Sequence, residues 1–89
     1  MLERRVTVTN RLGLHARASA KLVTLAKTFE SSISVKRGDG ITADAKSILS
    51  VLAIAATPGV ELTLAADGPD ETAAVDQVVE LFSTGFGED

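Results

Sequence analysis

Residues 5–29 read RVTVTNRLGLHARASAKLVTLAKTF, and they predict how the fold begins. Polar and apolar side chains alternate in residues 5–9, which places the two valines on one face of a strand. The asparagine and the glycine within residues 10–14 indicate a loop. Residues 16–28 then carry apolar side chains at helical spacing. The stretch therefore predicts a strand, a loop and a helix that begins just after His15.

A β-hairpin is predicted next along the chain. Apolar and polar side chains alternate in residues 32–36, and a second short run follows at residues 41–43. The Gly-Asp-Gly sequence at residues 38–40 lies between them and is expected to supply the positive φ angles of a tight turn. We expect Lys36 and Arg37 on this hairpin to form an ordinary solvated face.

Two further helices are predicted on either side of a strand. Residues 47–56 form a helix whose first residue, a serine, is a good N-cap, and a Thr-Pro-Gly sequence ends it because proline cannot continue a helix. Residues 60–66 alternate as a strand. Residues 68–71 open the last helix, with proline in its first turn and acidic residues at the positive end of the dipole, and Gly85 stops it. Its buried stripe is expected to consist of Val75, Val78, Val79 and Phe82.

The order β-α-β-β-α-β-α predicts an α+β sandwich of one sheet and one helical layer. The chain has 89 residues and is 45% hydrophobic, which suffices for one core, so residues 1–89 are expected to form a single domain. The pattern leaves the strand order open, because a ferredoxin-like arrangement uses the same first six elements.

Composition excludes several kinds of site and partner. The chain has no cysteine, so disulfides, thiolate metal sites and cysteine nucleophiles are excluded. A single histidine argues against a histidine-built metal site, and we expect neither a metal nor an organic cofactor. The net charge of -3 disfavours nonspecific binding to nucleic acid. The most apolar stretch, residues 51–56, is far too short to cross a bilayer, and no signal segment is apparent. We therefore predict a soluble cytoplasmic protein without nucleic-acid or membrane binding.

Residues 12–19, LGLHARAS, place His15 at the last position of a loop and Arg17 in the first helical turn. Unpaired backbone N–H groups and the helix dipole favour an anion there, and we expect residues 16–18 to bind phosphate. Neutral imidazole is a nucleophile near physiological pH, and a guanidinium fork suits phosphate oxygens. Gly13 lets the preceding backbone bend closely without a side chain in the way.

The same two side chains also have a purely structural interpretation. A lone histidine at a helix start is usually a surface residue, and Arg17 by itself is more often a solvated charge. Their combination at an anion-binding helix end, with no other nucleophile and base pair in the chain, makes a phosphohistidine site as well supported as the structural interpretation. Spacing alone goes no further.

Three motifs carry a resemblance to a known family. GLHAR at residues 13–17, followed by AKLV at residues 20–23, resembles the active-site signature of HPr, the histidine-containing phosphocarrier of the bacterial phosphoenolpyruvate-dependent sugar phosphotransferase system. AKSILSVL at residues 45–52 is similar to the regulatory-serine helix of this family. LFSTGFGED at residues 81–89 is similar to the ending of the nitrogen-related branch, called NPr.

The resemblance implies an open-faced β-sandwich with antiparallel strand order 1-4-2-3 and three helices on one face. It implies that enzyme I phosphorylates His15 on Nδ1 and that Arg17 steadies the phosphohistidine before transfer to an A-type domain of an enzyme II. The family usually has proline where this chain has Ala18. Alanine favours helix and keeps an N–H group, so we expect the helix to start normally.

Ser47 and the helix that follows it form a second candidate site. By position alone, Ser47 is a plain N-cap. The resemblance implies that HPr kinase/phosphorylase modifies it, which would put negative charge near a docking surface. Between residues 48 and 56 only Ser50 is polar, so a one-sided stripe cannot bury every side chain. With Val51 and Ala55 facing inward, Ile48, Leu49 and Leu52 are expected to form an exposed docking patch surrounded by Arg11, Lys21, Lys27 and Lys46. The alternative is a well-buried short helix.

The leading hypothesis is a monomeric phosphocarrier that serves as a substrate of other enzymes more than as an enzyme itself. Its expected partners are enzyme I, enzyme II A-type domains and HPr kinase/phosphorylase. A second hypothesis is a regulatory binding module of the same fold, controlled by charge at Ser47. A third, an RNA-binding ferredoxin-like module, is disfavoured because it needs aromatic side chains on the sheet, and the chain has only three, all phenylalanine.

Overall fold

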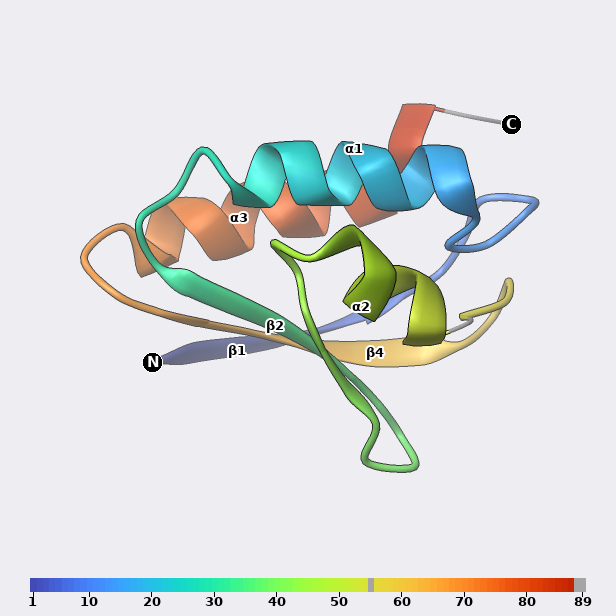
Figure 1. Cartoon of the computed structure of the whole chain (residues 1–89), viewed down its shortest axis with the longest axis horizontal. Coiled ribbons are helices and arrows are strands. Elements are labelled where there is room, and N and C mark those ends of the chain that lie inside the picture. Colours follow the sequence, from blue (N-terminus) through green and yellow to red (C-terminus); the bar gives the residue numbers. More distant parts are fainter. Residues whose placement is uncertain (55, 88–89) are drawn as a thin grey trace.

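The computed structural model describes residues 1–54 and 56–87, which form one sheet covered on one face by helices (Figure 1). The strands are β1 (Leu2–Thr7), β2 (Ser32–Arg37), β3 (Thr42–Asp44) and β4 (Glu61–Asp67). The helices are α1 (Ala16–Ala26), α2 (Ile48–Ile54) and α3 (Glu71–Ser83), followed by the short 3-10 helix η1 (Gly85–Gly87). The predicted element order is confirmed. None of the described helices is long and apolar enough to cross a membrane.

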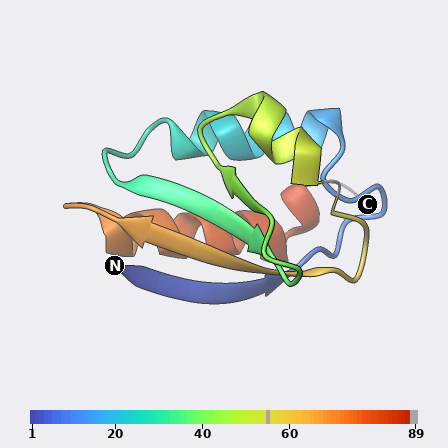
Figure 2. The ribbon, with the colours of Figure 1, turned by 60° about the horizontal axis from the view of Figure 1, so that its bottom comes forward.

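The four strands pair in the order β1-β4-β2-β3, and every pairing is antiparallel (Figure 2). This is the order implied by the resemblance, and it settles what the sequence pattern left open. The register places Val6 opposite Leu62 and Val35 opposite Leu64. Because side chains alternate along each strand, this register gathers the apolar residues on the face beneath the helices and leaves the other face to solvent.

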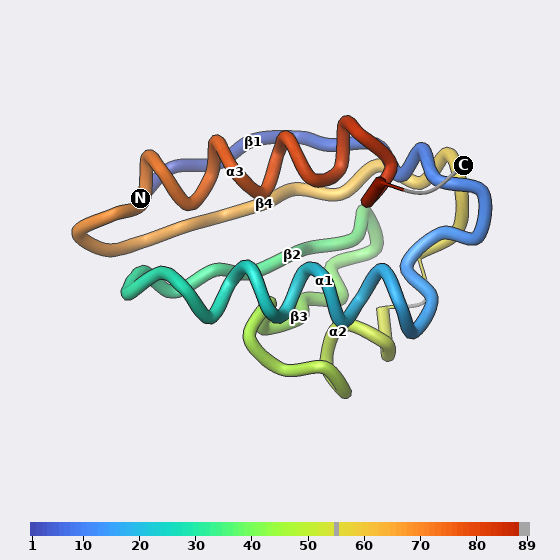
Figure 3. The backbone as a smooth tube through the Cα atoms, turned by 90° about the horizontal axis from the view of Figure 1, so that it is seen from above, coloured from blue at the N-terminus to red at the C-terminus, as the bar shows by residue number. Residues whose placement is uncertain are grey.

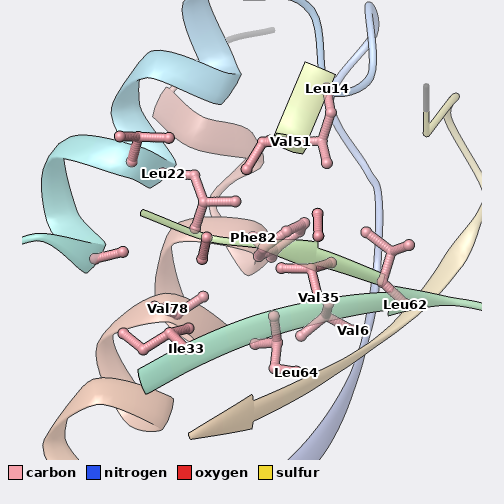
Figure 4. Packing of buried hydrophobic residues seen from close by; sticks show 14 of the residues in the cluster. Val6, Leu14, Leu22, Ile33, Val35, Val51, Leu62, Leu64, Val78 and Phe82 are labelled. Carbon is pink, nitrogen blue, oxygen red and sulfur yellow. The ribbon is translucent and has the colours of Figure 1, made fainter. Parts of the chain in front are cut away.

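The core lies between the sheet and the helices (Figure 4). Seen from above, α1 and α3 run over the sheet and α2 lies beside α1 (Figure 3). Leu22 of α1 and Val78 and Phe82 of α3 are almost completely buried against the strands. In α3, Ala74 belongs to the buried stripe, whereas Val79, which was expected there, is only partly buried. The prediction for Val79 was therefore wrong, and the other three members are confirmed.

The end of α3 brings an aromatic residue back into the core. Gly85 has a φ of 62° and ends the helix, as predicted. Phe86 follows with a φ of 59°, which a non-glycine residue rarely adopts. Its ring is 1% exposed and meets the ring of Phe82 edge to face, with centroids 4.8 Å apart. Burial of this ring holds the C-terminal turn against the helical layer.

The start of α3 differs from the prediction. Pro69 and Asp70 precede the helix, and the Asp70 side chain does not cap it. The carboxylate reaches back and accepts hydrogen bonds from the Ser31 hydroxyl and from the backbone N–H groups of Glu30 and Ser31. These bonds, the one from the hydroxyl foremost, lower the pKa of Asp70 to about 2. Asp70 therefore ties the connection between α1 and β2 to the start of α3.

The hairpin between β2 and β3 also differs in detail. Gly40 alone within its Gly-Asp-Gly turn has a positive φ, of 93°. Arg37 is not an ordinary solvated residue, because its guanidinium holds both carboxylate oxygens of Asp39 at 3.0 and 2.8 Å and donates to the carbonyl of Ile54. The guanidinium hydrogen bond keeps the pKa of Asp39 below its usual value. Arg37 thus fastens the hairpin to the last residue of α2.

Candidate functional site

His15 is the N-cap of α1, the position that the sequence predicts for it. Its backbone is extended, with φ -77° and ψ -176°, and its side chain is partly exposed. The Nδ1 atom accepts the backbone N–H of Arg17 at 3.2 Å. A ring nitrogen that accepts a hydrogen bond carries no proton, so the neutral ring has its proton on Nε2. The nitrogen that faces the helix mouth with its lone pair is therefore Nδ1.

The loop that delivers His15 rests on the segment after α2. Gly13 has a φ of 68°, and a Cβ placed there would lie 2.4 Å from the carbonyl oxygen of Ala56. Leu14 donates its N–H to that same oxygen at 2.9 Å. Asn10, which is buried, donates from Nδ2 to the carbonyl of Gly13 at 2.6 Å. The expected need for glycine at residue 13 is confirmed, since a side chain there would block the close approach of the loop to Ala56.

An open hollow of about 740 Å³ surrounds the imidazole. It is lined by Arg11, Leu12, His15, Ala16, Arg17, Lys21 and Gly87. Among the described residues, Arg11, Arg17 and Lys21 line the hollow with positive charge. Arg11 and Lys21, which were expected around the patch on α2, line the hollow beside His15. Lys21 also donates to the carbonyl of Phe86 at 2.6 Å, which holds the C-terminal turn at the rim of the hollow.

Within residues 1–54 and 56–87, no group of three or more histidine, cysteine, aspartate or glutamate side chains could hold a metal ion. Among the residues that the structure describes, the charged side chains that line the hollow with His15 are cationic, and the mouth of α1 offers backbone N–H groups, which favours an anion. The chemistry that this arrangement allows is nucleophilic attack by Nδ1 on an electrophile that carries negative charge.

Ser47 begins α2 as its N-cap, as predicted. Its hydroxyl oxygen accepts the N–H of Ser50 at 3.3 Å, and its carbonyl accepts the N–H of Val51 at 3.0 Å. Lys46 beside it donates from Nζ to the carbonyl of Phe29 at 2.8 Å. The ammonium of Lys46 is therefore held near the end of α1 rather than free above the patch.

α2 exposes three large apolar side chains. Leu49 is 77% exposed, Ile48 is 38% exposed and Leu52 is 37% exposed, whereas Val51 is buried. The predicted exposure of these three residues is confirmed, and the alternative of a well-buried helix is wrong. Ala55, which was expected to face inward, lies outside the described residues. We call Ile48, Leu49 and Leu52 the α2 patch.

A family model described as "PTS HPr component phosphorylation site" matches residues 2–84. The chain belongs to the HPr family. This assignment agrees with the motifs around His15 and Ser47 and with the observed strand order.

Known HPr-family proteins resemble this chain over nearly its whole length. The chain is 50% identical to phosphocarrier protein HPr of Cupriavidus necator, over 99% of this chain and 98% of that protein. It is 40% identical to phosphocarrier protein NPr of Proteus mirabilis, over 97% of this chain and 96% of that protein. The crystal structure of HPr-C-His from Thermoanaerobacter tengcongensis superimposes with a TM-score of 0.94 at 35% identity, over 100% of this chain and 99% of that chain.

Sequence reasoning missed two features of this HPr-family site. Leu12 is 69% exposed at the rim of the hollow, where it presents an apolar side chain next to His15. An aliphatic residue in a short polar loop was the available signal. Lys21 reaches the C-terminal turn across 65 residues of sequence, and no local pattern indicates such a contact.

Proposed function

We propose that this HPr-family protein carries a phosphoryl group on Nδ1 of His15, accepting it from phosphoenolpyruvate through enzyme I and passing it to an enzyme II A-type domain. The observation that carries the proposal is the hydrogen bond from the Arg17 N–H to Nδ1 at the mouth of α1. It orients one nitrogen, in its unprotonated form, toward a place that stabilises anions.

The transfer proceeds by attack of the Nδ1 lone pair on phosphorus. An N–P bond forms, the bond from phosphorus to its atom on enzyme I breaks, and the electron pair leaves with that atom. The proton on Nε2 stays in place throughout. The N–H of Arg17, which points at Nδ1 before transfer, then donates to a phosphoryl oxygen, with the N–H groups of Ala16 and Ala18 beside it.

The cations of the hollow act on the transferred group through charge. Arg17 offers a guanidinium fork to the phosphoryl oxygens, while Arg11 and Lys21 contribute positive potential from the rim. The site is open on one side, so a partner can approach phosphorus opposite to Nδ1. Moderate stabilisation suits a carrier, because interactions that bind the phosphorylated state too tightly would slow its release.

The α2 patch is proposed as the docking surface for both partners. α2 contacts α1, so a protein seated on Ile48, Leu49 and Leu52 reaches the hollow around His15. Leu12, which is exposed at the rim of the same hollow, adds a further apolar side chain beside the histidine. The α2 patch together with the cations of the hollow fits a partner that presents an apolar surface beside an acidic one.

Ser47 is proposed as a regulatory phosphorylation site for HPr kinase/phosphorylase. A phosphate on its partly exposed hydroxyl would stand next to Ile48 at the edge of the α2 patch. Its negative charge would oppose an acidic partner and weaken docking without unfolding α2. We further propose that residues 1–89 act as a single domain, as a monomer and in the cytoplasm, which leaves the α2 patch free for successive partners.

Phosphorylation by phosphoenolpyruvate and enzyme I tests this function. Wild-type protein is expected to acquire one acid-labile phosphoryl group, and His15→Ala none. Lys36→Ala, on the exposed face of the sheet, is the matched control and should be labelled like the wild type. Undiminished labelling of His15→Ala would defeat the proposal.

A further inference from the structure

We propose that Ser19 is a positioning residue for His15, and that its hydroxyl holds the histidine backbone in the orientation that aims Nδ1 at the helix mouth. This inference rests on the proposed function for its consequence in phosphoryl transfer. Ser19 is one of three buried polar residues in the described chain, together with Asn10 and Ser31, and its exposed fraction is 0%. Burying a hydroxyl costs free energy unless the hydroxyl is hydrogen-bonded. The group that accepts the hydrogen bond from Ser19 therefore shows which part of the chain this serine holds in place.

Ser19 makes two hydrogen bonds as a donor, and both go to the backbone next to the histidine. Its hydroxyl donates to the carbonyl of Leu14 at 3.1 Å. Its backbone N–H donates to the carbonyl of His15 at 2.8 Å. These two carbonyls belong to the peptide groups on either side of the His15 Cα. Ser19 therefore restrains both planes that define φ and ψ of His15.

A third hydrogen bond joins Leu14 to the segment after α2. The N–H of Leu14 donates to the carbonyl of Ala56 at 2.9 Å, so Leu14 is held through both of its backbone polar groups. The Leu14–His15 peptide thus cannot rotate without breaking a bond to α1. Since φ and ψ of His15 set the direction of its Cα–Cβ bond, rotation here would carry Nδ1 away from the N–H of Arg17.

The hydroxyl adds a constraint that the helix alone does not provide. The N–H bond from Ser19 to His15 belongs to the regular helical pattern, and any residue except proline would make it. The bond to Leu14 requires a short side chain with a donor. Alanine in this position keeps the helix and its packing but leaves the Leu14 carbonyl without this partner. Both hydrogen bonds that Ser19 donates go to backbone carbonyls, so it acts on the histidine through the backbone.

Ser19→Ala tests the inference, with Ser31→Ala as its matched control. Both variants remove one buried serine hydroxyl, but the hydroxyl of Ser31 donates to Asp70, away from the lining of the hollow. The imidazole ¹⁵N resonances, measured without enzyme I, report whether Nδ1 is an unprotonated hydrogen-bond acceptor. We expect Ser19→Ala to shift the Nδ1 resonance toward that of imidazole in water and Ser31→Ala to leave it unchanged.

Phosphorylation kinetics give the second measurement. Loss of one net hydrogen bond predicts that Ser19→Ala lowers the rate constant at saturating enzyme I by about 2- to 12-fold. The KM should remain unchanged because the α2 patch is untouched. Ser19→Cys, which keeps a weak donor of similar size, should fall between wild type and Ser19→Ala. The two measurements separate the proposals: wild type without label would defeat the carrier function, while the ¹⁵N comparison would still test Ser19. Ser19→Ala with the wild-type Nδ1 resonance and rate, or Ser31→Ala with equal losses, would overturn the inference.

Discussion

Replacing Gly13 by alanine is predicted to dislodge the loop that carries His15. The new Cβ would lie 2.4 Å from the carbonyl oxygen of Ala56 and 3.0 Å from the Cα of Thr57. Both are backbone atoms, so the loop itself must move. The left-handed conformation at φ 68° costs a non-glycine residue about 1–2 kcal/mol. Loss of the Leu14–Ala56 hydrogen bond brings the expected destabilisation to about 1.5–3.5 kcal/mol.

Two other glycines separate the cost of a positive φ from the cost of the clash with Ala56. Gly40 also has a positive φ, of 93°, but a Cβ added there would meet nothing within 4 Å, so Gly40→Ala should cost only about 1–2 kcal/mol. Gly38 has neither constraint, and Gly38→Ala should be neutral or slightly stabilising. Urea unfolding followed by circular dichroism measures all three, and phosphorylation by enzyme I should fall in Gly13→Ala alone. Gly13→Ala with the stability of Gly40→Ala and full phosphorylation would show that the close approach to Ala56 does not position the loop.

Two further outcomes are expected. Asp70, with a pKa of about 2 against 3.8 as its ordinary value, contributes stability that is complete above the ordinary value and is lost as pH falls from about 4 to 2. Asp70→Asn should therefore flatten this limb of the acid unfolding curve, and an unchanged limb would contradict the assignment. Leu49→Ser should leave the free energy of unfolding within about 0.5 kcal/mol but raise the KM for enzyme I about tenfold, because Leu49 is 77% exposed. Ile41→Ser, which alters an exposed aliphatic residue on the hairpin, should change neither, and an equal KM effect in both variants would argue against docking at α2.

The sequence predicted well those features that local pattern determines. The first strand and α1 are recognised from the alternation in residues 5–9 and the helical spacing after His15. The loop residues between them mark where one ends and the other begins. The same holds for Ser47 as N-cap and for the exposure of Leu49, since a seven-residue helix with apolar residues nearly all round cannot bury every one of them. The position of His15 at a helix start follows from the same local reasoning.

Contacts between distant segments could not be predicted in this way. Arg37 on the hairpin was predicted to be solvated. Its partner, the carbonyl of Ile54 at the end of α2, is 17 residues away, and nothing near Arg37 in the sequence indicates this contact. Asp70 was predicted to be part of a helix start, yet its carboxylate accepts hydrogen bonds from backbone N–H groups about 40 residues away in the sequence. The hydrogen bond from the Ser19 hydroxyl to the carbonyl of Leu14 spans only five residues, but Ser19 occupies a position within the apolar spacing of α1, which does not indicate it. In each case the partner is a backbone group, which leaves no signature in the side-chain pattern.

The identity of the phosphorylated atom shows whether Nδ1 of His15 carries the phosphoryl group. Protein labelled with ¹⁵N at histidine is phosphorylated with phosphoenolpyruvate and enzyme I, and the ³¹P–¹⁵N coupling is measured by NMR. The orientation of the imidazole over the N–H of Arg17 predicts coupling to Nδ1, with the proton retained on Nε2. Coupling to Nε2, or a phosphoryl group on any other residue, would contradict the account.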